Sequence, residues 1–182
     1  MTDLSTKFEG RATPLFERYA YPDWLATHSR LVGRIATVLA GARAEAGDPV
    51  EVEAVALAGY LHDIGRSPLV SGDARDHADL SALILAAEGL GGLAELVRRH
   101  PVYRLLDPAL APRTLEEKLV YVADRRGGQR VETLEARLRD TAARNPEFAA
   151  EIGRALGPAL ALEREVFADL PFGPDELGAL VR

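Results

Sequence analysis

Apolar residues recur at intervals of three and four along most of the chain, which places them on one face of an α-helix. The clearest stretch lies between Trp24 and Gly47, with inward positions at Leu25, His28, Leu31, Val32, Ile35 and Leu39. The alternation typical of β-strands is missing, as are the Asn-Gly and Asp-Gly pairs of tight hairpins. The pattern predicts an all-α fold, with helices over residues 24–46, 50–62, 76–88, 92–99, 115–126, 131–144, 147–170 and 175–181.

Residues that commonly begin helices support these boundaries. Asp23 precedes the first of them and can cap it. Thr114 and Glu117 have the spacing of a capping box at the start of the helix that follows them. No internal repeat or low-complexity tract divides the chain. We expect one domain of the helical-bundle type over the whole chain, with a core at about 22–138 and a C-terminal helical extension at about 139–182.

Length and composition exclude several kinds of protein and several kinds of site. The chain has 182 residues, 47% of them hydrophobic, which suits one globular domain. Its net charge of −6 makes nucleic acid an unlikely partner. The absence of cysteine excludes disulfides, thiolate chemistry and cysteine-type zinc sites. Neither a signal-peptide core nor an apolar stretch of membrane-spanning length is found, so a cytoplasmic protein is expected.

The chain holds four histidines, and each falls on, or at the end of, the apolar face of a predicted helix. They are His28, His62, His77 and His100. Four imidazoles that face one core would be costly to leave unpaired. Imidazole nitrogens that converge inside a helical bundle are well suited to bind a metal ion. A lone buried histidine is more often a core residue with a hydrogen-bond partner, and this reading stays open for His77 and His100.

Two aspartates complete a candidate metal site. Asp63 directly follows His62 at a helix end, and Asp124 comes from a distant predicted helix. Two histidines and two aspartates without a thiolate form a mixed nitrogen and oxygen site, which suits Mn, Fe, Co, Ni, Zn or Mg. Asp124 could instead be a helix-end carboxylate paired with Arg125 or Arg130.

Two segments resemble motifs of a known family. Residues 58–66, A-G-Y-L-H-D-I-G-R, resemble the H-D-I-G signature of the HD-domain superfamily of metal-dependent phosphohydrolases. Residues 117–125, E-K-L-V-Y-V-A-D-R, look like the last metal-ligand helix of that family. The family pattern is a histidine on an early helix, a His-Asp pair and a distant aspartate. The residues in these places are, in order, His28, His62, Asp63 and Asp124.

The resemblance implies a divalent metal ion held by those four residues. Some members of the family hold a second ion with two further histidines, matched here by His77 and His100, so one or two ions per chain are expected. Many relatives have lysine where this chain has Arg66, and arginine keeps the charge but cannot act as a base near neutral pH. We therefore expect Arg66 to contact a substrate phosphate, with Arg125 and Arg130 as further candidates. Solvated arginines on outer helical faces are the alternative.

The function that the resemblance implies is hydrolysis of a nucleotide or a related phosphate ester. The metal would lower the pKa of a bound water and neutralise charge on the phosphoryl oxygens, while Asp63 would orient that water. Two other functions stay open: a diiron oxygenase of the HD type, and a non-catalytic HD module that senses a ligand. The expected partner is a small phosphorylated substrate, with no membrane, and a homodimer stays open.

Overall fold

The computed structural model describes residues 2–181 and confirms the all-α prediction. Between residues 2 and 181 the one β-bridge joins Gly127 and Val131. The α-helices are α1 (Thr2–Arg18), α2 (Asp23–Glu45), α3 (Val52–Leu61), α4 (His77–Ala87), α5 (Ala94–Arg98), α6 (Leu115–Arg126), α7 (Leu134–Arg144), α8 (Ala149–Phe167) and α9 (Leu177–Leu180). Short 3₁₀ helices join them: η1 (Ile64–Arg66), η2 (Pro68–Val70), η3 (Gly91–Leu93), η4 (Val102–Leu106), η5 (Pro146–Phe148) and η6 (Pro174–Glu176).

Helices α2 and α3 form the centre of the fold and lie unusually close together. A Cβ atom at Gly33 would stand 2.3 Å from the ring of Tyr60, and one at Gly59 would stand 2.7 Å from Ala36. The two glycines therefore let α3 lie directly on α2. This contact brings the end of α3, where His62 follows, against the first turns of α2, where His28 lies.

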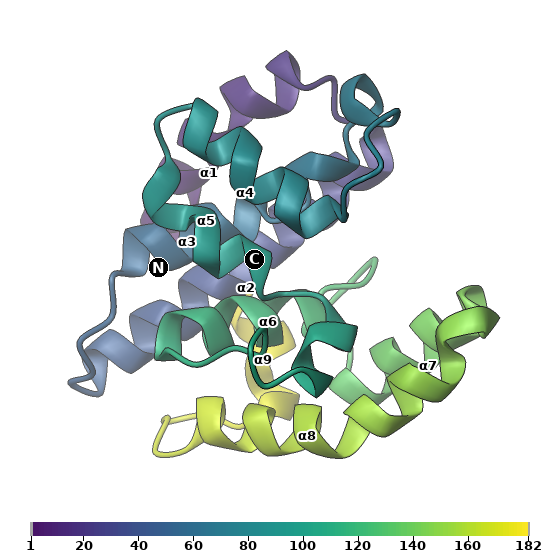
Figure 1. Ribbon diagram of the computed structural model, residues 1–182. Coiled ribbons are helices and arrows are strands. Elements are labelled where there is room, and N and C mark those ends of the chain that lie inside the picture. The colour runs from purple at the N-terminus through teal and green to yellow at the C-terminus, as the bar shows by residue number, and fades with distance from the viewer. Residues whose placement is uncertain (1, 182) are drawn as a thin grey trace.

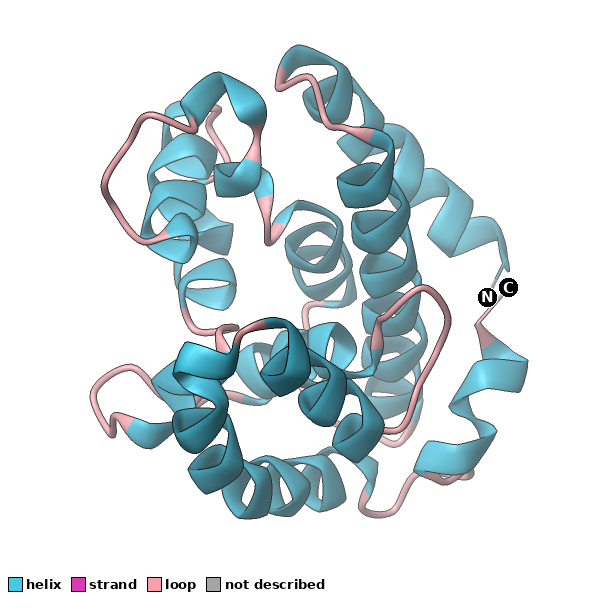
Figure 2. Cartoon of the chain, turned by 90° about the vertical axis from the view of Figure 1, so that its right-hand side faces the viewer, coloured by secondary structure: helices cyan, strands magenta, loops and turns pink. Residues whose placement is uncertain are grey.

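Helix α6 packs on the α2–α3 pair and separates two groups of helices. Figure 1 shows α4 and α5 on one side of α6, and α7 and α8 on the other. Figure 2, turned by 90°, shows the described chain as helices joined by loops. Helix α8 also packs against η4, which lies between α5 and α6 in the chain. The two groups of helices are in contact at this point. Helix α6, which carries Asp124, thus lies between an N-terminal half and a C-terminal pair of helices.

Several predicted boundaries agree with the structure and some do not. The capping box is confirmed, because Thr114 and Glu117 exchange both of its hydrogen bonds. The predicted cap at Asp23 is wrong: Asp23 is the first residue of α2, Pro22 precedes it in an extended conformation, and no side chain caps the helix. The predicted helix 147–170 is divided into η5 and α8.

The first helix, α1, was not predicted. Proline usually interrupts a helix, and Pro14 lies inside this one. Phe8, Ala12 and Phe16 nevertheless enter the same hydrophobic core as α2 and α3. Their burial stabilises a segment whose local signals were weak.

The C-terminal helices pack on the body of the molecule. Ile152, Ala155 and Leu162 of α8 belong to the main hydrophobic core. Buried Arg126 of α6 forms an ion pair with Glu163 of α8, with 3.2 Å between Nη1 and Oε1. None of the helices described between residues 2 and 181 has both the length and the apolar character needed to cross a bilayer.

Candidate metal centre

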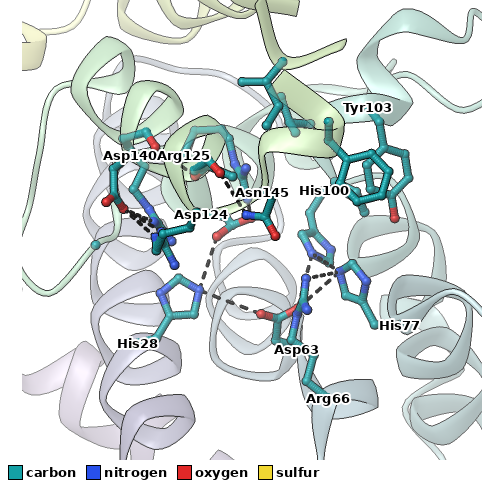
Figure 3. Close-up of a pocket in the computed structure, with 18 of the residues that line it drawn as sticks. His28, Asp63, Arg66, His77, His100, Tyr103, Asp124, Arg125, Asp140 and Asn145 are labelled. Carbon is teal, nitrogen blue, oxygen red and sulfur yellow. Dashed lines mark hydrogen bonds and ion pairs between the residues drawn. The ribbon is translucent and has the colours of Figure 1, made fainter. Parts of the chain in front are cut away.

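Six side chains from five parts of the chain meet beside α6, and Figure 3 labels five of them: His28, Asp63, His77, His100 and Asp124. His28 comes from α2, and His62 and Asp63 directly follow α3. His77 is the first residue of α4, and His100 follows α5 by two residues. Asp124 lies in the last turn of α6. The structure therefore brings together all six residues that the sequence singled out as metal ligands.

Gly65 allows the turn after Asp63 to approach α4. A Cβ atom at residue 65 would stand 2.2 Å from the carbonyl oxygen of His77. The Gly65 amide also donates a hydrogen bond to Ser81 Oγ at 2.9 Å. Any larger residue here would push α4 away and separate His77 from Asp63.

The first group of donor atoms comprises His28 Nε2, His62 Nε2, Asp63 Oδ2 and Asp124 Oδ1. The two imidazole nitrogens lie 3.2 Å apart. Asp124 Oδ1 lies 3.3 Å from His28 Nε2 and 3.6 Å from His62 Nε2. Asp63 Oδ2 lies 3.9 and 3.5 Å from the same two nitrogens. Ligands that surround one ion at 2.0–2.2 Å lie roughly 3–3.5 Å from one another, so the four atoms nearly match a metal site.

The other oxygen of Asp63 faces a second group. Asp63 Oδ1 lies 3.5 Å from His77 Nε2 and 3.4 Å from His100 Nε2, and these two nitrogens are 3.3 Å apart. His62, Asp63 and His100 also gather donor atoms within 4.8 Å of one another. Asp63 thus connects the two groups through its two oxygens.

Backbone carbonyls fix the protons of two imidazoles. His62 Nδ1 lies 2.9 Å from the Gly59 oxygen, and His100 Nδ1 lies 2.6 Å from the Val97 oxygen. A carbonyl oxygen only accepts, so each Nδ1 donates, and in a neutral imidazole Nε2 carries the lone pair. Metal-binding histidines commonly have such a partner. The lone pairs at the centre therefore suit a cation.

Two arginines contact the aspartates of the centre. Arg66 Nε donates to Asp63 Oδ1 at 2.9 Å, and Arg66 Nη2 lies 3.0 Å from His77 Nε2. Buried Arg125 pairs with Asp124 Oδ2, which was the alternative reading of that aspartate, while Asp124 Oδ1 still faces the histidines. Arg130 is exposed and is not among the described residues that line the cleft at this centre.

The family model for the HD domain matches residues 25–126. The chain belongs to the HD-domain family. This confirms the resemblance drawn from the two motifs. HD domains bind divalent metals, and this one contains a His/Asp cluster that could hold one. No curated protein and no solved structure matches the chain significantly. The matched range includes all six converging residues and ends before α7.

Burial and neighbouring charge shift the pKa values in this HD domain. Desolvation opposes the charged form of both aspartates, but neighbouring charges outweigh it. His62 and Arg66 hold the pKa of Asp63 well below its usual range. Arg125 and His62 do the same for the pKa of Asp124. Desolvation lowers the pKa of His77 to about 3 and also lowers that of His100. For His62, desolvation is outweighed by Asp63 and Asp124, so its pKa rises. The centre thus combines ionised carboxylates with neutral His77 and His100.

The candidate metal centre borders a cleft of about 1040 Å³, whose other wall is formed by the C-terminal helices. The residues of that wall are Arg137, Asp140, Thr141, Arg144, Asn145, Phe148, Glu151 and Ile152. Trp24 and Tyr103 also line the cleft. Sequence reasoning missed Arg137 and Phe148 as cleft residues because neither belongs to a motif, and their place in the cleft depends on how α7 and α8 pack.

Proposed function

We propose that this HD-domain protein is a metal-dependent phosphohydrolase that acts on a nucleotide or a related phosphate ester. The observation that carries the proposal is the convergence of His28 Nε2, His62 Nε2, Asp63 Oδ2 and Asp124 Oδ1. His28, Asp63 and Asp124 line the cleft, and His62 lies buried behind them. Neutral imidazole and carboxylate oxygen are suitable ligands for Mn, Fe, Co, Ni, Zn or Mg. These four residues would hold the ion.

The chemistry can be divided between the ion and the side chains around it. A divalent ion would supply charge for the phosphoryl oxygens and lower the pKa of a bound water. Asp63 would orient the attacking water by accepting a hydrogen bond from it. Arg66 lines the cleft and would donate charge-assisted hydrogen bonds to a phosphate oxygen. Arg125 holds Asp124 Oδ2 and so keeps Oδ1 directed at the histidines.

The cleft supports a substrate of nucleotide size. Ligand pockets of small molecules usually span about 300–1,000 Å³, and this cleft has about 1040 Å³. Three of its aromatic side chains, Trp24, Tyr103 and Phe148, are exposed. Such rings offer flat apolar faces to a base, while the arginines of the cleft offer partners for phosphate.

Hydrolysis is favoured over the oxygenase alternative by one contact. A diiron site needs a second iron at Asp63, His77 and His100. Arg66 donates to Asp63 Oδ1 and approaches His77 Nε2, so a positive charge already lies on two of these donors. A non-catalytic sensor would have no need for the complete set of six donors.

Metal analysis joined to a substrate screen tests the proposal. Purified protein should contain at least one divalent ion per chain. It should release phosphate from nucleotides, lose this activity with a chelator and regain it with Mn²⁺. A variant of exposed Glu45 at the far end of α2, Glu45→Gln, serves as the control and should behave as the wild type. Bound metal with oxygen consumption and no phosphate release would favour the oxygenase, and bound metal with neither would favour a sensor.

A further inference from the structure

The guanidinium of Arg66 lies on the second group of donor atoms. Its Nε donates to Asp63 Oδ1 at 2.9 Å, and its Nη2 lies 3.0 Å from His77 Nε2. Figure 3 shows Arg66 beside Asp63 and below His77. Arg66 therefore engages two of the atoms that a second metal ion would require.

Without Arg66, this second group would be well shaped for an ion. Asp63 Oδ1, His77 Nε2 and His100 Nε2 are separated by 3.3 to 3.5 Å. Ligands around one ion at 2.0–2.2 Å have roughly this spacing. The His100 Nε2 lone pair faces the group because Nδ1 donates to the Val97 carbonyl. Three acceptors at such distances repel one another unless a cation lies among them, and Arg66 supplies that cation.

Charge balance points the same way. The two carboxylates of the centre, Asp63 and Asp124, are matched by the two guanidiniums of Arg66 and Arg125. One divalent ion in the first group leaves a net charge of about two, which suits the dianion of a phosphate monoester. A second divalent ion beside Arg66 would add two further charges a few ångströms away, in surroundings that screen them poorly.

We propose that Arg66 and a second divalent ion exclude each other, so that the wild-type protein holds one ion tightly and a second only weakly. This inference rests on the proposed metal centre but not on the reaction catalysed there. The side chain of Arg66 is 45% exposed and lines the cleft, so it can turn away from Asp63. His100 is held by its hydrogen bond to the Val97 carbonyl and cannot move aside as Arg66 can.

The choice of arginine at residue 66 matters for this contact. A guanidinium presents several donors in a planar fork and can engage Asp63 and His77 together. A lysine ammonium is a single point charge. Arg66 is thus a residue that sets metal number as well as a candidate for phosphate binding.

Counting metal ions in matched variants tests this proposal. Apo-protein is loaded with Mn²⁺ and desalted, the metal is measured by mass spectrometry, and Mn²⁺ coupling is followed by electron paramagnetic resonance. We expect one ion per chain in wild type and two, spin-coupled, in Arg66→Ala and in Arg66→Met, which keeps the length without the charge. The double variant Arg66→Ala/His77→Ala should return to one ion. Arg144→Ala, at another exposed arginine of the cleft, should remain at one.

The affinity of the second ion gives the same test in graded form. Hydrogen bonds to charged groups are worth about 1.5–3 kcal/mol, so loss of Arg66 should tighten the second Mn²⁺ by about ten- to a hundredfold. Two equally tight ions in wild type, or one ion in both Arg66 variants, would overturn the inference and leave the proposed hydrolase intact. No bound ion in any of the proteins would overturn the metal centre itself, and this inference with it.

Discussion

The two walls of the cleft differ in how their polar side chains are held. On the wall built from α2 to α6, His62 is fully buried, and Asp63 and Asp124 are only 6% and 2% exposed. On the wall built from α7 and α8, the side chains of Asp140 and Arg144 are 53% and 57% exposed. The first wall fixes its groups by burial and by contacts between distant elements. The second keeps them accessible to a ligand.

The partners of these side chains differ in the same way. His62 and His100 each donate to a backbone carbonyl, and they meet carboxylates from other helices. Asp140 is paired within its own helix, with Arg137 at i−3 and Arg144 at i+4. Exposed pairs of this kind are worth little and can open for a ligand. The HD-family match ends at residue 126, so the fixed wall carries the chemistry that the family shares, and we expect the adaptable wall to select the substrate.

The largest effect is expected on the fixed wall. His62→Ala or Asp63→Ala should remove the metal and reduce kcat/KM by roughly a thousandfold or more, beyond the 10–100-fold typical of ligand partners one shell further out. The reason is that donors of one ion act as a unit. Metal content and phosphate release, measured together, check this, with circular dichroism to confirm folding. Variants that retain stoichiometric metal would contradict the ligand assignment.

A smaller loss is expected from Arg137 on the opposite wall. Its side chain is 14% exposed, lines the cleft and donates to the Gly127 carbonyl at 3.1 Å. Arg137→Ala should lower kcat/KM for phosphorylated substrates by about tenfold, the worth of one charge-assisted bond, while metal content stays the same. Arg139→Ala is the matched control, because Arg139 lies on the same helix, is 74% exposed and pairs with Glu135. Equal losses of kcat/KM in the two variants would mean that Arg137 does not contact the substrate.

Phe148 should contribute less and act on binding alone. Its ring is 50% exposed at the cleft, where it can stack on a base. Phe148→Ala should raise KM for nucleotides about two- to tenfold, as expected for aromatic pairs worth 0.5–1.5 kcal/mol, with kcat unchanged. Leu83→Ala, at an exposed apolar side chain of α4, is the control. A KM that rises equally for inorganic pyrophosphate and for nucleotides would argue against stacking.

The last effect is on stability and not on activity, and concerns the pH dependence of the metal-free protein. Desolvation lowers the pKa of His77 to about 3, below the value of about 6.5 in an unfolded chain. Its stabilising contribution is therefore complete above pH 6.5 and is lost as the pH falls towards 3. His62, with a raised pKa, acts in the opposite direction, so the comparison must be made against a variant.

Denaturant unfolding at pH 7 and pH 5 measures this contribution. The wild type should lose more free energy of unfolding between the two pH values than His77→Gln, which has no imidazole to protonate. Equal losses in the two proteins would mean that His77 is not held neutral by its surroundings.

Local sequence was sufficient for much of the fold and for singling out the six residues that the structure brings together. The spacing of Leu25, Val32 and Ile35 determines which face of α2 is buried, because helical geometry relates neighbours three and four residues apart. The capping box at Thr114 is also a local device, since its hydrogen bonds span three residues. Helix α1 was not predicted because Phe8 and Phe16 are stabilised by core contacts with residues elsewhere in the chain, which the local sequence does not reveal.

Only the tertiary structure decided how the site residues face one another. The order of His28, His62, Asp63 and Asp124 is written in the sequence, but the division of the two Asp63 oxygens between two groups of donors depends on how α2, α4 and α6 pack. The position of Arg66 on the second group depends on the close contact that Gly65 permits with α4. Burial along one helix is periodic and can therefore be predicted from the sequence. Distances of 3 to 4 Å between donor atoms of different helices depend instead on side-chain packing over the whole core.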